Sequence, residues 1–580
     1  MKRSGYIVIA IIVILAAVAV LYIHFSAEAN DPKQKVPKAE SAADIRPLVV
    51  KKLQQLVKDG SDGLYNLSVE KLEPDITHSQ LDLINATLIP DTSALQKLNG
   101  LKKAPDDVYK ISLDSLHING ITINDVIHSD NIQLDSIFLY NPVVEVYHDP
   151  KRYNAEQRKE DSSITLYQKV MKQVKSVSVN SIIVNHATLI SKQAEEKNKT
   201  KTYEDVNASF SHLLIDSTTQ FDKNRFLFAK EAELSFKNYV ARTPDSLYFF
   251  KVGSVSVVAT NHTMIAKDVS LVPRGNKEEF VKKLPYRDDR YDIHTPKVVL
   301  NNVDWWKLAN HENLFAAEAD VYDCVIKDYI DRSLPPPSNV NFDNFPSQLL
   351  LGVPLKIDVG KINLHQWKVE YEEYNPQVKK SSGIYFDNLN GTLENLTNVK
   401  SSINKNAHVS FSGSAMFMSK VETKCKFQFD LSKPKTADCS FDLQMGALNK
   451  TILNPFAEPL GFFKVKSGEM KEGTVHLEGN IYTMRCEILM LYNDLHLTPL
   501  KPEGDSSGNL KKKSVTSFIA NTFFIKNNNP SKGEAPRNID VVVQRDHHDH
   551  FFNFLWKSLL TGLVKTIGVP EKYANKNEGK

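Results

Sequence analysis

Hydrophobic and polar residues alternate along most of this chain from Leu64 onward. Residues 81–88, for example, read Leu-Asp-Leu-Ile-Asn-Ala-Thr-Leu. A period of two is typical of strands that bury one face, because successive side chains of a strand point to opposite faces of the sheet. The pattern therefore predicts a mainly β protein.

Three stretches share a pattern of strand, bend and strand, at 111–123, 177–189 and 357–369. The second and third are each followed, after a polar loop, by another related stretch, at 206–213 and 386–393. Repeated strand units that stack bury one another's apolar faces. We therefore expect an elongated sheet built from repeated strand units.

Helical patterns are sparse in this sequence. A period of 3.6 predicts an amphipathic helix over 47–57, with Pro47 in its first turn and Gly60 at its end. Shorter helical patterns occur at 166–174 and 305–308, and another lies near the C-terminus. Because so few helices are available to cover the sheet, it must curl on itself, pair with a second sheet or enclose something apolar.

Residues 6–23 form a run of 18 apolar residues that follows Lys2 and Arg3. About 20 apolar residues in a helix cross a bilayer core of about 30 Å. Positive residues favour the cytoplasmic side, so we predict a single-pass anchor with a cytoplasmic N-terminus and the bulk of the chain exported. The residues predicted to contact the membrane include Ile7, Ile11, Ile14, Val18 and Leu21.

A cleaved signal peptide is the alternative interpretation of this run. Ala27-Glu28-Ala29 has the small-x-small spacing of a cleavage site. The apolar core of a signal peptide usually has about 7 to 15 residues, which favours the anchor. Either interpretation places most of the chain outside the cytoplasm.

Changes in composition divide the chain into parts. The sequence around 277–292 is charged and loop-like, and Pro335-Pro336-Pro337 forms a rigid break. The predicted parts are a cytoplasmic tip and transmembrane helix (1–25), a tether (26–46), a first β-groove region (47–275), a connecting segment (276–347), a second β-groove region (348–500), a polar linker (501–514), C-terminal strands with an amphipathic capping helix (515–570) and a tail (571–580).

Charge and cysteine content narrow the range of functions. The net charge is only +3 and no basic stripe is present, which argues against a nucleic-acid partner. Four cysteines are too few for a disulfide scaffold in 580 residues. Cys425 and Cys439 can meet across a hairpin that turns near 433–435, although the centre of that turn does not place them directly opposite.

Catalytic and metal motifs are missing from the sequence. It lacks G-x-S-x-G, G-x-x-x-x-G-K-[ST], G-x-G-x-x-G and H-E-x-x-H, so we predict neither an enzyme nor a bound cofactor. The most metal-like string is Asp546-His547-His548-Asp549-His550. Adjacent histidines diverge on regular structure, so we favour a solvated helix cap over a metal site.

The C-terminal helical pattern places large apolar residues on one face. These residues are Phe552, Leu555, Trp556, Leu559 and Leu563. We expect this helix to plug the open end of the sheet and cover its last strand edge. The alternative is an amphipathic segment that contacts a membrane or a partner.

Several of these stretches together resemble the AsmA-like proteins of Gram-negative envelopes. They are the anchor, the repeated strand units, 355–364, 386–391, and 454–460 with 465–468. The closing stretch 551–562 is similar to the end of a Bacteroidetes-type branch of that group. The resemblance implies a periplasmic protein, anchored in the inner membrane, whose curled sheet forms an apolar groove for phospholipid acyl chains. Members of the group are not known as enzymes, and the bridging members are typically longer than this chain.

We therefore predict a non-catalytic protein that shields or transfers lipids between inner and outer membrane, or assists outer-membrane assembly. Its partners would be phospholipid or other acyl chains, the inner membrane and other envelope proteins. Each methylene removed from water contributes about 0.8 kcal/mol, so an apolar lining needs no specific chemistry. The predicted lining residues include Ile121, Ile123, Val184, Leu189, Leu364 and Val369.

Two other functions remain open at this point. The first is a structural scaffold of dry β-sandwiches that docks envelope proteins. The second is an envelope hydrolase, which requires a carboxylate or histidine cluster with shifted pKa values in a cleft.

Overall fold

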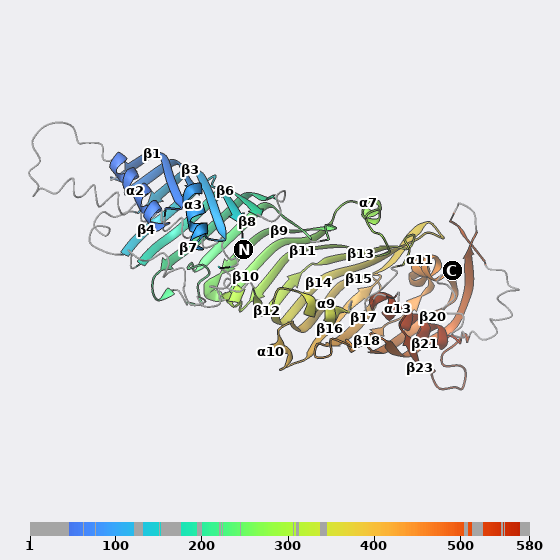
Figure 1. Cartoon of the computed structure of the whole chain (residues 1–580). Coiled ribbons are helices and arrows are strands. Elements are labelled where there is room, and N and C mark those ends of the chain that lie inside the picture. Colours follow the sequence, from blue (N-terminus) through green and yellow to red (C-terminus); the bar gives the residue numbers. More distant parts are fainter. Residues whose placement is uncertain are drawn as a thin grey trace, which may run out of the picture. The chain divides into compact units, whose positions relative to one another are not determined.

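The computed structural model describes residues 46–568, except 62, 76, 121–130, 150, 152, 154–175, 194–199, 220–221, 223, 244, 306, 309–312, 337–344, 504–507, 513–525, 547–548 and 550. Of the described residues, 59% are in strands and 16% in helices. The strands belong to one long mixed sheet of 23 strands (Figure 1). The prediction of a mainly β protein with few helices is confirmed.

The predicted anchor over 6–23 and the predicted lining residues Ile121 and Ile123 lie outside the described residues. None of the helices within the described ranges combines the length and the apolar character needed to cross a bilayer.

Contacts divide the chain into two compact units. Unit 1 comprises Met1–Val240, Val252–Ala266 and Asn301–Asn313, and unit 2 comprises Ala241–Lys251, Lys267–Leu300 and Leu314–Lys580. The predicted opening helix is present as α2 (Arg46–Gly60). The elements that follow, up to the middle of the chain, are β1 (Tyr65–Asp75), β2 (Gln80–Pro90), α3 (Thr92–Gly100), β3 (Asp107–Asn119), β4 (Asn131–Tyr140), β5 (Val143–His148), β6 (Ser176–Gln193), β7 (Thr200–Ile215) and β8 (Glu231–Arg242).

The second half of the chain has a similar order of elements. They are β9 (Tyr248–Val258), η2 (Ala259–Asn261), β10 (Thr263–Pro273), α7 (Lys277–Val281), β11 (Arg290–Asn301), β12 (Leu314–Tyr322), β13 (Val325–Asp331), α9 (Pro346–Gly352), β14 (Ile357–Asn375) and β15 (Lys380–Thr397). The chain continues with α10 (Lys400–Ile403), β16 (His408–Phe417), β17 (Val421–Asp430), β18 (Cys439–Met445), β19 (Leu448–Asn449), α11 (Lys450–Gly461), β20 (Phe463–Gly479), β21 (Thr483–Pro502), β22 (Leu510–Lys512), β23 (Asn538–Gln544) and α13 (Phe551–Thr566).

Two stretches of the chain repeat one topology, and we call 65–215 the first copy and 248–397 the second copy. In the first copy β6 pairs in parallel with both β4 and β5, and antiparallel with β7. In the second copy β14 pairs in parallel with both β12 and β13, and antiparallel with β15. The corners also match, because Asn141 and Asp323 both have a φ of 49°. One long strand thus spans two short ones in each copy.

The predicted repeats correspond to this duplication only in part. Residues 177–189 and 357–369 are equivalent parts of β6 and β14, with bends at His186 and Gln366, where φ is 54° and 55°. The stretch that begins at Ile111 lies in β3, whose counterpart is β11 instead. The same hydrogen bond occurs in β3 and in β11, which identifies them as counterparts. The amides of Tyr109 and Tyr291 each donate to a tyrosine hydroxyl of an earlier strand at 3.2 Å.

The predicted connecting segment, 276–347, contains regular structure. A capping box between Asn276 and Glu279 starts α7, and β11, β12 and β13 follow. β11 contains Pro296, and proline lacks the amide that a central strand needs. The pairing of β11 with β13 ends at His294, so the proline breaks no bond of that ladder.

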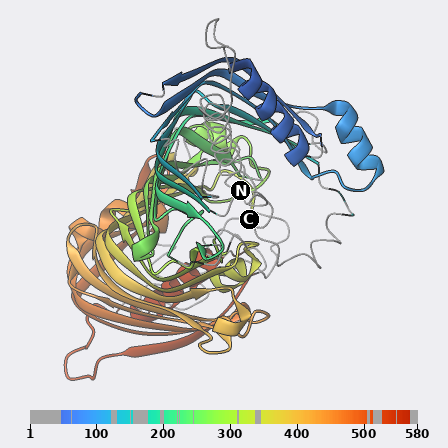
Figure 2. The same ribbon diagram turned by 90° about the vertical axis from the view of Figure 1, so that its left-hand side faces the viewer.

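After the second copy, β15 to β18 and then β20, β21 and β23 form a continuous antiparallel ladder. Within unit 2 these strands curve around α13, drawn in red (Figure 2). The predicted hairpin near 433–435 is present between β17 and β18. Cys425 lies opposite Leu443 and Cys439 opposite Phe429, and all four cysteines are free thiols.

Candidate functional site

The predicted lining residues occupy equivalent places in the two copies. Val184 of β6 pairs with Leu139, and Leu364 of β14 pairs with Val321. Leu189 and Val369 are equivalent in the same way, opposite Val144 and Ile326. Val184 and Leu364 are 7% and 8% exposed, so both are core positions.

The apolar face of unit 1 is closed by aliphatic side chains. Its core residues come from β1 to β4, β6 and β7, with contributions from α2 and β8. Several of them are fully buried: Leu83, Leu116, Ile118, Ile137, Val177, Val179 and Ile182. This face therefore has the density of an ordinary protein core.

The apolar face of unit 2 combines aliphatic side chains with a group of aromatic rings. Its rings form a connected set, which we call the phenylalanine face: Phe345, Phe411, Phe427, Phe429, Phe441 and Phe551. Phe411 and Phe427 stack with centroids 4.9 Å apart, and Phe441 contacts both Phe427 at 5.9 Å and Phe551 at 5.8 Å. Aromatic contacts of this kind add about 0.5–1.5 kcal/mol each to the burial of area.

Two glycines make room for one end of the phenylalanine face. Gly391 and Gly413 are paired in adjacent strands. A Cβ atom on Gly391 would lie 2.8 Å from the ring of Phe411, and a Cβ atom on Gly413 would lie 2.6 Å from it. The ring therefore lies flat over two backbones that carry no side chain.

The C-terminal helix α13 covers the other end of this face. It packs on β21 and β23. Phe551 and Phe554 are buried at 4% and 0% exposure, and Leu555, Leu559 and Leu563 pack at the margin of the same cluster. That α13 plugs an open end and covers the last strand edge stays a prediction.

Two residues of the predicted apolar face of α13 do not pack on the sheet. Phe552 and Trp556 are 60% and 43% exposed, whereas the small and polar residues Ser558, Gly562 and Thr566 are buried. A Cβ atom on Gly562 would lie 2.5 Å from Ile488, so the glycine lets the helix approach the sheet closely. The close contact at Gly562 decides which face of α13 packs on the sheet. Phe552 and Trp556 lie on the other face, away from the sheet.

The start of α13 is fixed by a buried carboxylate rather than a solvated one. Asp549 is 3% exposed, and its carboxylate lies 3.2 Å from the ammonium of Lys557. The guanidinium of Arg545 donates to the Asp549 carbonyl and lies over the Phe345 ring, 5.0 Å from its centroid. The prediction of a solvated helix cap is therefore wrong for Asp549, whose side chain is buried. The three histidines of that string lie outside the described residues, and the described part of the chain holds no group of metal-ligating side chains.

Two hollows are present in unit 2, with volumes of about 860 and 910 Å³. The larger hollow includes Leu364, but most of its lining side chains are polar, among them Asn363, His365, Lys424 and Asp442. Neither hollow has the continuous apolar lining expected of an open groove.

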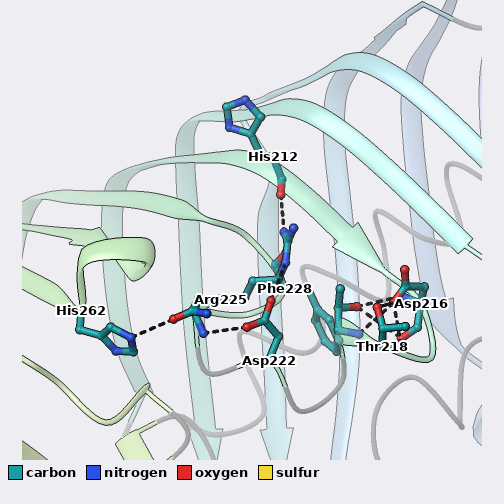
Figure 3. A network of polar contacts seen from close by, with 9 residues as sticks. His212, Asp216, Thr218, Asp222, Arg225, Phe228 and His262 are labelled. Carbon is teal, nitrogen blue, oxygen red and sulfur yellow. Dashed lines mark hydrogen bonds and ion pairs between the residues drawn. The ribbon is translucent and has the colours of Figure 1, made fainter.

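A polar network orders the loop between β7 and β8 in unit 1 (Figure 3). The carboxylate of Asp216 accepts from the Thr218 amide at 2.8 Å. Arg225 donates to the carbonyls of His212 and Phe228 at 2.7 and 3.0 Å. Because these bonds join backbone groups and side chains that are close in sequence, we interpret the network as loop structure rather than a reaction site.

Sequence reasoning missed a partly buried carboxylate in unit 2, one oxygen of which is inaccessible to solvent. Asp328 lies in a row between Tyr291 and Tyr371 on the neighbouring strands. Burial, together with the nearby Asp289 and Asp288, raises the pKa of Asp328 to about 8. Burial also raises the pKa values of both tyrosines. One signal was available: Asp328 is polar at a position where the alternation in β13 predicts a buried side chain.

Asp328 does not look like part of a catalytic site. The hydroxyls of Tyr291 and Tyr371 donate to Asp289 and Glu373, at 3.3 and 2.9 Å, instead of to Asp328. Oδ1 of Asp328 has no hydrogen-bond partner among the described residues. None of these groups lines either hollow.

Comparisons with known proteins identify no relative. No protein-family model and no curated protein matches the chain. Among solved structures, that of the sex pheromone staph-cAM373 precursor covers 62% of this chain and 96% of its own, with 8% identity and a TM-score of 0.12. A likeness at that level carries no argument about fold or function, and the AsmA-like resemblance stays a prediction.

Proposed function

We propose that this protein holds lipid acyl chains at the phenylalanine face of unit 2 and shields them from water during transfer between envelope membranes, without catalysing a reaction. The predicted anchor over 6–23 would hold it at the inner membrane, with its bulk in the periplasm.

One observation carries this proposal. The exposed Phe552 contacts the buried Phe551, with ring centroids 5.1 Å apart, and Phe551 contacts Phe429 and Phe441. An aromatic path thus leads from solvent into the apolar face of the sheet. Exposed Trp and Phe side chains next to a core are typical of surfaces that bind apolar partners.

The energetics require no reactive group. Each methylene of an acyl chain that leaves water contributes about 0.8 kcal/mol. Phe427 and Phe441 lie at the margin of the unit 2 cluster and are only partly buried. An acyl chain would therefore enter beside Phe552. It would displace contacts between partly buried side chains at the edge of the phenylalanine face and leave the fully buried side chains in place.

The test is lipid analysis of the full chain extracted from membranes in mild detergent. We expect co-purifying phospholipid by mass spectrometry, and at least a fivefold lower lipid-to-protein ratio in F552S/W556S. V542S is the matched control, because Val542 is 55% exposed on β23 of the same unit. An equal ratio in wild type, double variant and control would contradict the proposal.

A structural scaffold is the second candidate. The closed aliphatic face of unit 1 favours it, because fully buried residues leave no room for a ligand. A wild-type protein that carries no lipid after gentle extraction would support the scaffold and remove the lipid proposal.

A further inference from the structure

The hollow of about 860 Å³ lies within unit 2, along one side of α11. Its other walls are the start of β15, the start of β20 and the start of β22. Three of these four segments are far apart in sequence, so only folding brings their side chains together.

The lining of this hollow is strongly basic. It contains Lys380, Lys450, Lys464 and Lys466, and its only acidic residue is Glu458. Glu458 is already engaged, with its carboxylate 3.0 Å from the ammonium of Lys464. The other three lysines form no ion pair within the part of the chain that the structure describes. Three lysines at one hollow thus lack a carboxylate partner among the described residues, and the ammonium of Lys450 donates to the Lys466 carbonyl at 3.4 Å.

Hydrogen bonds fix the walls of the hollow to one another. Pro459 has no amide hydrogen, so the carbonyl of Pro455 lacks its usual partner in α11. The hydroxyl of Ser382 in β15 donates to that carbonyl at 2.8 Å. The Asn454 side chain bonds both the amide and the carbonyl of Val465 in β20, at 2.8 and 3.0 Å. The walls are therefore ordered before a ligand binds, so binding loses less conformational entropy.

We propose that this hollow binds a phosphate-bearing anion, either the headgroup of an anionic phospholipid or a free phosphate. Lysines suit a multiply charged tetrahedral anion because their ammonium groups act as freely oriented point charges. The hydroxyls of Ser381 and Thr451 also line the hollow and supply neutral donors. The positive end of the 12-residue helix α11 adds to the same field.

This inference goes beyond the acyl-chain proposal and does not rest on it. The residues of the hollow share no member with the phenylalanine face. Either site can therefore fail its test while the other passes.

The experiment uses the full chain in detergent micelles and two probes. Inorganic phosphate is titrated by calorimetry at fixed ionic strength, and vesicles of phosphatidylcholine with or without phosphatidylglycerol are tested by flotation. We expect K380E/K466E to weaken phosphate binding at least tenfold. K424E/K426E is the charge-matched control on the same unit, outside this hollow, and should bind phosphate within twofold of wild type.

The two probes also separate the two sources of phosphate. Binding of both phosphate and phosphatidylglycerol vesicles, each lost in K380E/K466E only, assigns a headgroup. Binding of phosphate alone, lost in the same variant, assigns a free anion. No binding of either probe, or an equal loss in both variants, overturns the proposal. If K380E/K466E does not fold, phosphate-dependent protection of the α11 amides from hydrogen exchange in the wild type decides the question.

Discussion

The two copies of the duplicated topology differ at one equivalent row of three residues. In the first copy the row is Tyr109, Val146 and Ser191, across β3, β5 and β6. In the second copy it is Tyr291, Asp328 and Tyr371, across β11, β13 and β14. The strand order and pairing are the same, so the backbone tolerates either an apolar or an ionisable residue at the centre.

The units also differ in how they close their apolar faces. Unit 1 fills its face with aliphatic side chains of the strands themselves. Unit 2 uses phenylalanines and adds α13 from the end of the chain. This contrast shows that one sheet design supports both a sealed core and a face that depends on a separate helix. The following experiments test it.

Replacing Phe554 with alanine should have the largest effect. Phe554 belongs to α13 and its side chain is fully buried, so its loss leaves a cavity and should lower the free energy of unfolding by about 3–5 kcal/mol. Denaturant unfolding of F554A measures this, with F552A as control because Phe552 is 60% exposed. Similar values for the two variants would show that α13 does not close the face.

Replacing Ile137 with alanine tests the sealed face of unit 1. Ile137 is fully buried, and we expect a loss of about 2–4 kcal/mol. Its equivalent in the second copy is Ala319, which pairs with Ile362 as Ile137 pairs with Ile182. Hydrogen exchange should increase in peptides of unit 1 and stay unchanged in α13. A spread of the increase into α13 would mean that the two faces do not act separately.

Replacing Asp328 with asparagine tests the differing row. The folded state raises the pKa of Asp328 from 3.8 to about 8 because of burial and the nearby Asp289 and Asp288. The folded protein therefore holds this proton more tightly than the unfolded chain, and its stability falls as pH rises from about 4 to about 8.

D328N removes that loss. It should be more stable than wild type at pH 8.5 by on the order of 2 kcal/mol and nearly equal at pH 4. Melting curves at several pH values measure the difference, with D442N as control, since Asp442 is exposed. A wild-type pH dependence that persists unchanged in D328N contradicts the assignment.

Replacing Gly562 with alanine should have the smallest effect of the four. Alanine favours a helix over glycine by about 1 kcal/mol. A Cβ atom here would lie 2.5 Å from Ile488 and 2.9 Å from Cys486, and overpacking of this kind costs about 1–3 kcal/mol. We expect a net loss of about 1 kcal/mol by denaturant unfolding. A more stable G562A would show that the close approach does not set the orientation of α13.

Local patterns predicted several elements of this fold. The alternation from Leu64 onward predicted strands, and Pro47 and Gly60 marked the limits of α2 closely. The equivalence of Val184 and Leu364 was visible in the repeats. Patterns failed over 276–347, where β11, β12 and β13 lie in a stretch predicted to be a connecting segment.

Within the candidate sites, sequence reasoning identified the residues of α13 but not which of them are exposed. The helical period places Phe552 beside Leu555, yet Gly562 and Ser558 decide which side meets the sheet. The phosphate hollow was not predictable, because Lys380, Lys450 and Lys466 have no shared local pattern.

The sequence by itself determined the strands, their bends and the apolar face of each, since these follow from side-chain periodicity and the steric preferences of neighbouring residues. Only the tertiary structure decided which strands pair in parallel, that Asp328 is partly buried, that Phe552 and Trp556 stay exposed and that three lysines converge on one hollow. These features depend on register and on contacts between residues far apart in the chain, and neither is encoded in any short window of sequence.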